Sequence, residues 1–295
     1  MPWIRAAIAV AIVAVATGCS LTEDLSNFGS GAGATSGAGG AGASGGQASG
    51  GSASGGSGGT GAPSFGHALA LRTTCASANT RNSQKLAFGT EPFTVELWFS
   101  VNELVNYQTL VHHGGTSPDR PGWGIELGAG VIVFGGSDGT NYVNAAAFGV
   151  ILPQHHYHLV AVRDGSAAEL WLLDRTRGET VHRLIGEEPM FPTSWDSAEL
   201  FAIGDQASTN VQCVGYDLDG VIDELRIWSG RRTQEELDAT YLTTVDCDTG
   251  GLIGYWRFEE ATGGTIGNCA GPEVLQINDG TEPRDYQWVD SPFDE

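Results

Sequence analysis

The sequence predicts an all-β fold, a sandwich of two antiparallel sheets with one short helix, preceded by a disordered tether rich in Gly, Ser and Ala. Many short segments alternate apolar and polar residues, as strands with one buried face do. Clusters of Gly, Pro, Asp and Asn separate these segments at short spacing. Helical patterns are few, and this combination is typical of sandwiches and related all-β folds.

The first residues have the layout of a secretory signal. Arg5 precedes a short apolar stretch, which is below the roughly 20 residues that a bilayer span needs, so we expect a cleaved signal peptide over residues 1–18. Residues 16–19 resemble a lipobox, which implies that Cys19 is lipidated and begins the mature chain. The alternative is an ordinary signal peptide cut before Cys19. Ser20 gives no inner-membrane retention signal, so the resemblance implies a cell-envelope protein anchored in the outer membrane of a Gram-negative bacterium.

The next segment cannot build a core. Residues 29–62 are Gly, Ala and Ser, with Thr35, Gln47 and Thr60 as the exceptions. Such side chains bury too little apolar surface to offset the entropy of ordering the chain. We therefore divide the protein into the signal peptide (1–18), the lipidated cysteine with its flexible tether (19–62) and one folded domain (63–295).

The charge balance excludes several partners. The net charge is −21, from 35 acidic and 14 basic residues. Nucleic-acid binding requires a basic face, so we expect no nucleic-acid partner, and contact with the membrane only through the lipid. The carboxylates leave room for calcium, although they also simply keep a protein soluble.

Four cysteines remain once Cys19 is assigned to the lipid. An even number in an oxidising compartment indicates two disulfides. Of the three possible pairings we favour Cys247–Cys269, which brackets one strand and its following loop, and this leaves Cys75–Cys213. A zinc site is the alternative, but the CxxC spacing that it usually needs is absent.

The clearest strand covers residues 93–101, where apolar and mostly polar positions alternate over nine residues. Residues Thr233 to Glu236 form a capping box, which predicts a helix ending near residue 242, with Leu237 and Tyr241 on the face that docks on the sheet. Further strands are expected at 109–112, 124–127, 131–134, 142–146, 158–163, 169–173, 180–185, 199–203, 221–228 and 254–258.

Several of these segments resemble the LamG-like jelly-roll domain, a concanavalin A-like lectin/glucanase sandwich. The most specific match is Asp219-Gly220-Val221-Ile222-Asp223-Glu224-Leu225-Arg226-Ile227-Trp228, which is similar to a strand of that family and is followed by the short helix. The resemblance implies a concanavalin A-like jelly roll and, by association, carbohydrate binding. The other matching segments, in the family's order along residues 66–292, are 93–99, 157–165, 169–174, 200–204 and 252–259.

One aspartate is placed as a core residue would be. Asp223 shares a strand face with Val221, Leu225 and Ile227, which we expect to point inward, and a carboxylate there must be hydrogen-bonded, paired or bound to a metal. It is either a structural aspartate or a calcium ligand together with Asp217 and Asp219. The same run is the nearest approach to a glycosidase carboxylate motif, but its spacing is wrong and Gly220 interrupts it.

Histidines 112, 113, 155, 156 and 158 suggest zinc, but no Cys or acidic neighbour in the sequence completes a site, so we interpret them as structural or surface residues. Two loops carry the aromatic, amide and carboxylate groups that sugar sites use. From these loops we take as candidate ligand-binding residues Asp119, Trp123, Asp138, Asn141 and Tyr142. The alternative for Trp123 and Tyr142 is that each covers a sheet edge.

We therefore expect a displayed, non-catalytic binding domain and not an enzyme. Its partner would be a glycan or a surface protein of the envelope, and calcium is the one cofactor for which the sequence leaves room. One alternative is a structural or adhesion module that makes protein contacts and binds no sugar. Another is a glycoside hydrolase.

Overall fold

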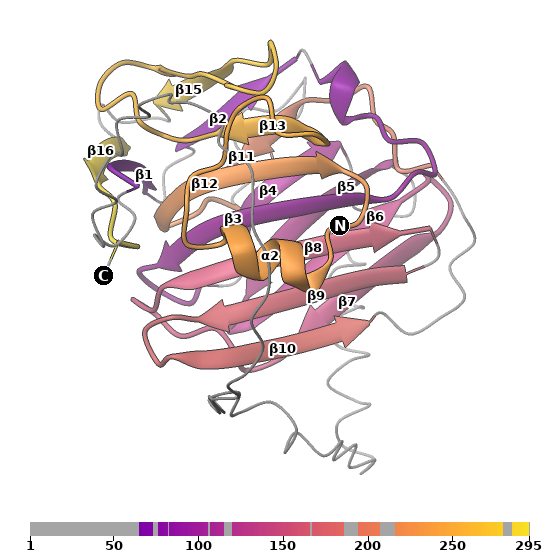
Figure 1. The fold of residues 1–295 in the computed structure, drawn as a ribbon, viewed down its shortest axis with the longest axis horizontal. Helices are drawn as coiled ribbons and strands as arrows, with labels where there is room; N and C mark the ends of the chain where they lie inside the picture. The colour runs from indigo at the N-terminus through magenta and orange to yellow at the C-terminus, as the bar shows by residue number, and fades with distance from the viewer. Residues whose placement is uncertain are drawn as a thin grey trace, which may run out of the picture. The chain divides into compact units, whose positions relative to one another are not determined.

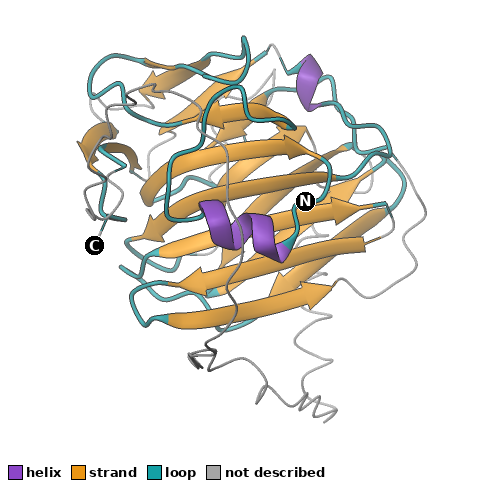
Figure 2. Cartoon of the chain, viewed as in Figure 1, coloured by secondary structure: helices purple, strands orange, loops and turns teal. Residues whose placement is uncertain are grey.

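Two antiparallel sheets lie face to face with the core between them (Figure 1, Figure 2). The computed structural model describes residues 65–72, 76–81, 83–105, 107–114, 120–165, 167–185, 194–206, 216–279 and 285–294. The predictions for the signal peptide, Cys19, the tether, Cys75, Cys213 and Asp119 lie outside these ranges. No helix in the described part has the length and apolarity needed to cross a membrane.

The front sheet in Figure 1 has the strand order β10-β9-β8-β3-β12-β1-β16, and β13 also pairs with β12. The central strand β3 alternates as predicted, because its odd-numbered residues all belong to the core. The strands of this sheet are β1 (His67–Leu71), β3 (Phe93–Val101), β8 (Tyr157–Asp164), β9 (Ala167–Asp174), β10 (Glu179–Ile185), β12 (Gly220–Ser229), β13 (Leu252–Trp256) and β16 (Tyr286–Asp290).

The back sheet has the order β14-β15-β2-β11-β4-β5-β6-β7. Strands β1, β2, β14, β15 and β16 were not among the predicted strands. The residues of β2, Ala-Ser-Ala-Asn-Thr, show why, since Ala, Ser and Asn carry little strand preference. The strands of this sheet are β2 (Ala76–Thr80), β4 (Gln108–Gly114), β5 (Gly122–Gly128), β6 (Val131–Ser137), β7 (Tyr142–Ala147), β11 (Phe201–Ile203), β14 (Thr265–Ile266) and β15 (Leu275–Asp279).

Helix α2 (Gln234–Thr240) lies across the outer face of the front sheet (Figure 2), and a 3₁₀ turn, η1 (Gln84–Leu86), precedes β3. The predicted capping box is confirmed, because Thr233 accepts from the Glu236 amide and Glu236 accepts from the Thr233 amide. Leu237 packs against Val160, Val162 and Trp171. The helix ends at Thr240, two residues before the predicted end. Because α2 covers the outer face of the front sheet, both faces of β3 are buried.

A β-bulge in β12 overturns one prediction. The register with β3 shifts between Asp223 and Arg226, and Glu224 has a positive φ of 50°. The extra residue reverses the alternation. As a result Ile222, Leu225 and Ile227 belong to the core, whereas Val221 packs with the outer cluster around Trp98. The expectation that Asp223 shares a face with Leu225 and Ile227 is therefore wrong.

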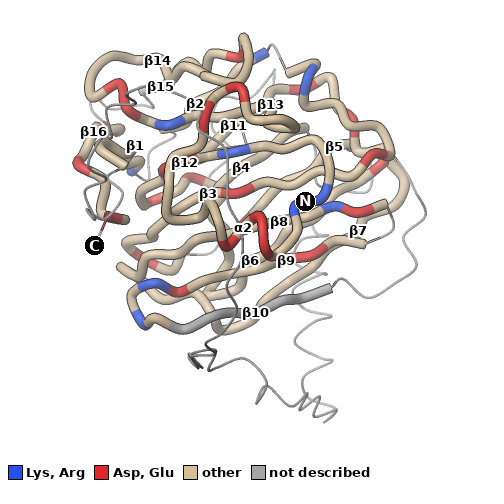
Figure 3. Tube along the Cα trace, in the orientation of Figure 1, with Lys and Arg blue, Asp and Glu red and all other residues tan. Residues whose placement is uncertain are grey.

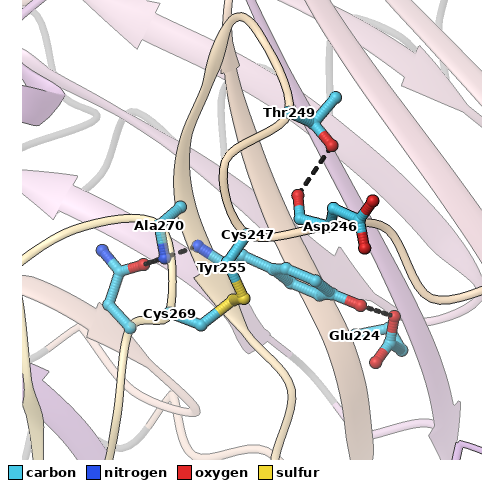
Figure 4. Close-up of a disulfide and its surroundings, with 8 residues drawn as sticks. Glu224, Asp246, Cys247, Thr249, Tyr255, Cys269 and Ala270 are labelled. Carbon is cyan, nitrogen blue, oxygen red and sulfur yellow. Dashed lines mark hydrogen bonds between the residues drawn. A yellow bond between two sulfur atoms is a disulfide. The ribbon is translucent and has the colours of Figure 1, made fainter.

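The Cys247–Cys269 disulfide is present, with a Cα–Cα distance of 5.4 Å (Figure 4). It joins the loop before β13 to the loop between β14 and β15. The side chain of Tyr255, on β13 between the two cysteines in sequence, points to Glu224 on β12 and donates a hydrogen bond to it. The disulfide therefore holds a strand whose side chains reach a buried charged cluster.

The two ends of the folded unit meet. Strand β1 lies between β12 and β16, and the Phe65 amide donates to the Asp294 carboxylate over 2.6 Å. The Ser291 amide donates to the carbonyl of Gly66 over 2.9 Å. Phe65 and Phe293 then pack on Trp98 at the outer face of the front sheet.

Candidate functional site on the outer face of the back sheet

Strand alternation defines the outer face of the back sheet. Trp123 and Ile125 of β5 and Phe134 of β6 belong to the core, so Gly124 and Gly135 between and beside them face outward. On β7, Ala145 and Ala147 are core residues. The residues between and before them, Tyr142, Asn144 and Ala146, therefore lie on the outer face.

Three of these outward positions form one row across the sheet with His112 of β4, whose neighbour Val111 is a core residue. The register pairs His112 of β4 with Gly124, Gly124 with Gly135, and Gly135 with Asn144 of β7. We call this the glycine row. Glycine within a strand weakens the sheet, and it often marks a place where a ligand or another chain approaches the backbone closely. A polar side chain stands at each end of this row.

Tyr142 lies diagonally over the glycine row. Its hydroxyl oxygen is 2.5 Å from the position that a Cβ atom on Gly135 would occupy, so no other residue fits at 135 without moving the tyrosine. Burial raises the pKa of the Tyr142 hydroxyl, and the nearby Glu126 carboxylate raises it further. The hydroxyl therefore keeps its proton and can donate it in a hydrogen bond.

A carboxylate and an amide stand beside the row. Glu126, two positions after Gly124 on β5, is only 9% exposed. The side-chain amide of Gln206, just after β11, donates to Glu126 Oε1 over 2.6 Å. Together they present carboxylate and amide groups, which are the partners that sugar hydroxyls require.

His112 closes the other end of the row. It is 3% exposed, and its Nδ1 atom is buried with no hydrogen-bond partner among the described residues. Burial lowers the pKa of His112 to about 3, with further contributions from His113 and Arg120, so the ring is neutral. A buried polar atom without a partner is uncommon in folded proteins, and here it lies next to a position without a side chain.

The face is more accessible at one side than at the other. Tyr142, Asn144 and Val133, on β6 and β7, are half-buried, whereas Glu126 and His112, on β5 and β4, are buried. A ligand arriving at the β6–β7 side would meet an aromatic ring and an amide first. The carboxylate and the neutral imidazole lie further in. This order is suited to binding a polar molecule by hydrogen bonds.

The two predicted binding loops are neighbours, but their residues have other roles. Pro121 Cδ lies 3.5 Å from the Cβ position of Gly139, so the loop before β5 meets the β6–β7 turn. Trp123 is 1% exposed in the core and contacts Phe93, so the prediction that it contacts a ligand is wrong. The reason is that strand β5 begins at Gly122, which puts Trp123 at an inward position of the strand rather than in the loop.

Asp138 and Asn141 shape the β6–β7 turn. The Asp138 carboxylate accepts from the amides of Thr140 and Asn141 over 2.7 and 2.6 Å and from the Asn141 side chain over 3.1 Å. These hydrogen bonds lower the pKa of Asp138. Such bonds are typical of an Asx turn, and they place Tyr142 at the start of β7. Among the predicted residues, Tyr142 is the one that lies on the outer face beside the glycine row.

The aspartates proposed for calcium do not gather. Asp223 accepts from the Ser291 hydroxyl over 2.7 Å and from the Glu224 amide over 2.8 Å. Burial and the adjacent Glu224 raise the pKa of Asp223 well above its ordinary value. Asp219 accepts from Asn102 over 2.8 Å instead. In the described part of the chain, no three His, Cys, Asp or Glu residues form a group that could hold a metal ion, and calcium binding by Asp217, Asp219 and Asp223 stays a prediction.

A second polar cluster, not predicted from the sequence, lies under α2 on the front sheet. The Arg226 guanidinium bonds to Glu224, and its Nη1 is 4.0 Å from Glu96 Oε2. It also donates to the carbonyls of Thr240 and Thr243 over 2.9 and 2.6 Å. All three charged side chains are buried, so the cluster fastens the end of α2 and cannot meet a large ligand. The sequence shows charged residues within β3 and β12, but it does not show that a helix covers them.

Comparisons with known proteins agree with this architecture. A family model described as the concanavalin A-like lectin/glucanases superfamily matches residues 73–238. A Bacteroides ovatus protein described as a candidate carbohydrate-binding protein is 15% identical with a TM-score of 0.55, covering 78% of this chain and 61% of its own. No curated protein matches the chain at a significant level.

Two further solved structures are more distant. The CBM40 domain of a Ruminococcus gnavus sialidase is 13% identical with a TM-score of 0.46, and the match covers 61% of this chain and 100% of that domain. Domains LG4-5 of the mouse laminin α1 chain are 12% identical with a TM-score of 0.41, and the match covers 55% of this chain and 40% of that one. At these identities the likeness concerns the fold alone.

Proposed function

Because the chain belongs to the concanavalin A-like lectin/glucanases superfamily, we propose that it is a displayed glycan-binding domain whose site is the outer face of the back sheet. The observation that carries the proposal is the Glu126–Gln206 pair beside the glycine row. Carboxylate and amide groups next to an accessible aromatic ring are the usual means of holding sugar hydroxyls. The B. ovatus protein, which is described as a candidate carbohydrate-binding protein, supports the same function.

The proposed function is binding without catalysis. A glycosidase needs two carboxyl groups flanking the scissile bond, about 5–10 Å apart. On strands β4 to β7 the register places one carboxylate on the outer face, Glu126, and it is engaged by Gln206. Display on the cell envelope through Cys19 belongs to the proposal on the strength of the signal-like sequence of residues 1–19.

The test is binding of the Cys19→Ser chain, which cannot be lipidated, to an array of glycans in calcium and again in EDTA. We expect binding to at least one glycan, and binding lost in EDTA would add calcium to the proposal. Asn144→Ala removes an amide from the accessible side of the face and should weaken binding about tenfold, the equivalent of one hydrogen bond.

The matched control is Gln287→Ala, which removes an exposed amide from β16 on the other sheet and should leave binding unchanged. No binding in either buffer would reject the glycan proposal and favour a module that makes protein contacts. Equal losses of glycan affinity in Asn144→Ala and Gln287→Ala would mean that the outer face of the back sheet is not the binding site.

A further inference from the structure

The strand order of each sheet ends in two edge strands, and three of these four edges are protected against pairing with another chain. Strand β10 carries a β-bulge between Thr180 and His182, and β16 ends in the charged Asp290. Strand β14 is only two residues long. Bulges, charged residues and short length are usual means by which proteins keep an edge strand from pairing with another chain. The fourth edge strand, β7, has none of them.

Strand β7 is regular and uncharged. Its sequence is Tyr-Val-Asn-Ala-Ala-Ala, without a charged residue or a proline. Its pairing with β6 runs through all six residues without a shift in register. The other edge of β7 has no partner strand in the described part of the chain. A regular, unpaired edge offers a row of N–H and C=O groups, which is a template for one more strand.

The side chains at this rim of the sandwich are apolar. Phe148 directly follows β7 and is 41% exposed, and it is one of three exposed large hydrophobic residues in the described part of the chain. Val143 and Val150 pack against the core but are only partly buried. A second chain lying along β7 would remove apolar surface from water in addition to making main-chain hydrogen bonds.

The same stretch is free of charge in an acidic protein. Residues 139–154 contain no Asp, Glu, Lys, Arg or His, whereas the whole chain has a net charge of −21. Figure 3 shows acidic residues over much of the rest of the described chain. Two copies of the protein therefore repel each other over most of their surface. At the neutral stretch around β7 they can meet without placing like charges against each other.

We propose that β7 pairs with β7 of a second copy, antiparallel about a two-fold axis perpendicular to the sheet, so that two back sheets become one continuous sheet. A strand that faces its own copy is self-complementary, as a two-fold dimer requires. This symmetry keeps Tyr142 and Asn144 of both copies on the same outer face, close to the join. The pairing does not require that this face binds glycans, but it would place two candidate sites side by side.

The test is the mass of the Cys19→Ser chain in solution, measured by sedimentation and by light scattering over a wide range of protein concentration. We expect a monomer–dimer equilibrium that stops at the dimer, because pairing uses the free edge of β7 in both copies. Raising the salt from 10 mM to 1 M shortens the screening length from about 30 Å to about 3 Å. The dimer should then become tighter, because the copies repel each other and the residues at the join are uncharged.

Two substitutions locate the interface. Phe148→Ser removes the exposed ring beside β7 from both copies and should weaken the dimer at least about tenfold. Ala146→Glu places a negative charge on β7 of each copy and should weaken it at least about tenfold as well. The matched controls are Val274→Ser, at an equally exposed apolar position before β15, and Gln287→Glu on edge strand β16, and both should leave the dimer unchanged. If Ala146→Glu does not fold, the exposed Phe148 position still decides the result.

Several results would overturn the pairing. They are a chain that stays monomeric at every concentration and salt, assemblies larger than a dimer, and a dimer that dissociates as the salt is raised. A dimer that Phe148→Ser leaves intact, or that Val274→Ser weakens equally, would also overturn it. Glycan binding is measured separately, so a monomer would leave the proposed function standing, and a dimer without glycan binding would leave the pairing standing.

Discussion

Three buried histidines are held neutral in the folded chain. Burial lowers the pKa of His112 to about 3 and that of His113 to about 4, and it also lowers the pKa of His158 despite the nearby Glu96 carboxylate. An unfolded histidine titrates near 6.5. Between these values the unfolded chain binds more protons than the folded chain, so these groups stabilise the fold above about pH 6.5 and their contribution is lost as the pH falls.

His113 offers the clearest test of this linkage. It is fully buried, and its Nε2 lies 3.1 Å from the Ser83 hydroxyl. Between pH 7 and pH 5 the contribution of His113 to the free energy of unfolding should fall by about 2 kcal/mol. The drop in the free energy of unfolding over this pH range should therefore be about 2 kcal/mol smaller in His113→Asn than in the wild type. The measurement is urea unfolding at several pH values. His67→Asn, at a partly exposed position, is the control, and identical pH profiles for wild type and His113→Asn would contradict the assignment.

Arg226 is the residue whose loss should cost most. It contacts two buried glutamates, Glu224 and Glu96, and it donates to two carbonyls at the end of α2. Removing one partner of a buried ion pair costs about 3–5 kcal/mol, because the remaining charge stays buried. Arg226→Met should therefore lower the free energy of unfolding by about that amount in urea melts.

Two comparisons make the Arg226 result specific. Arg72→Met, at an exposed position, should change stability by less than about 0.5 kcal/mol. Adding Glu224→Gln to Arg226→Met should restore part of the loss, since it removes the uncompensated charge. A loss in Arg226→Met no larger than in Arg72→Met would mean that the cluster is not a stabilising contact.

At the scale of elements, the disulfide holds strand β13, which contacts the buried charged cluster under α2. Cys247 and Cys269 are 22 residues apart, and the strand between them carries Tyr255 to the Glu224 carboxylate. Loop-closure entropy predicts a contribution of about 3 kcal/mol for a loop of this size. The double variant Cys247→Ser with Cys269→Ser should lower the unfolding midpoint accordingly, and the unaltered chain in reductant should match it. A midpoint equal to that of the oxidised wild type would show that the crosslink adds nothing.

The elements that the sequence predicted well are those whose signal is local. The alternation of β3 and the capping box of α2 are patterns within one segment, and both are confirmed. The bulge at Glu224 depends on how β12 pairs with β3, so the alternation around Asp223 pointed to the wrong face. Trp123 was misplaced for a related reason, because the first residue of a strand decides which way its side chain points.

At the scale of the molecule, the all-β architecture followed from composition, spacing and family resemblance, but the candidate site did not. The glycine row joins positions 112, 124, 135 and 144, which lie on four different strands. A shift of one residue in any pairing would move a member to the other face, and a single sequence does not fix that register. Of the predicted binding residues that the structure describes, Tyr142 alone lies beside the glycine row.

The hydrogen bond from the Phe65 amide to Asp294 has a consequence for engineering. Because the two ends of the folded unit touch, a linker of a few residues would close the chain into a ring without disturbing β1 or β16. The connection between β7 and β8, with the exposed Gly149, is then a natural place to open a circular permutant. The same closeness of the ends would let the whole unit be inserted, as a cassette, into a surface loop of an unrelated protein.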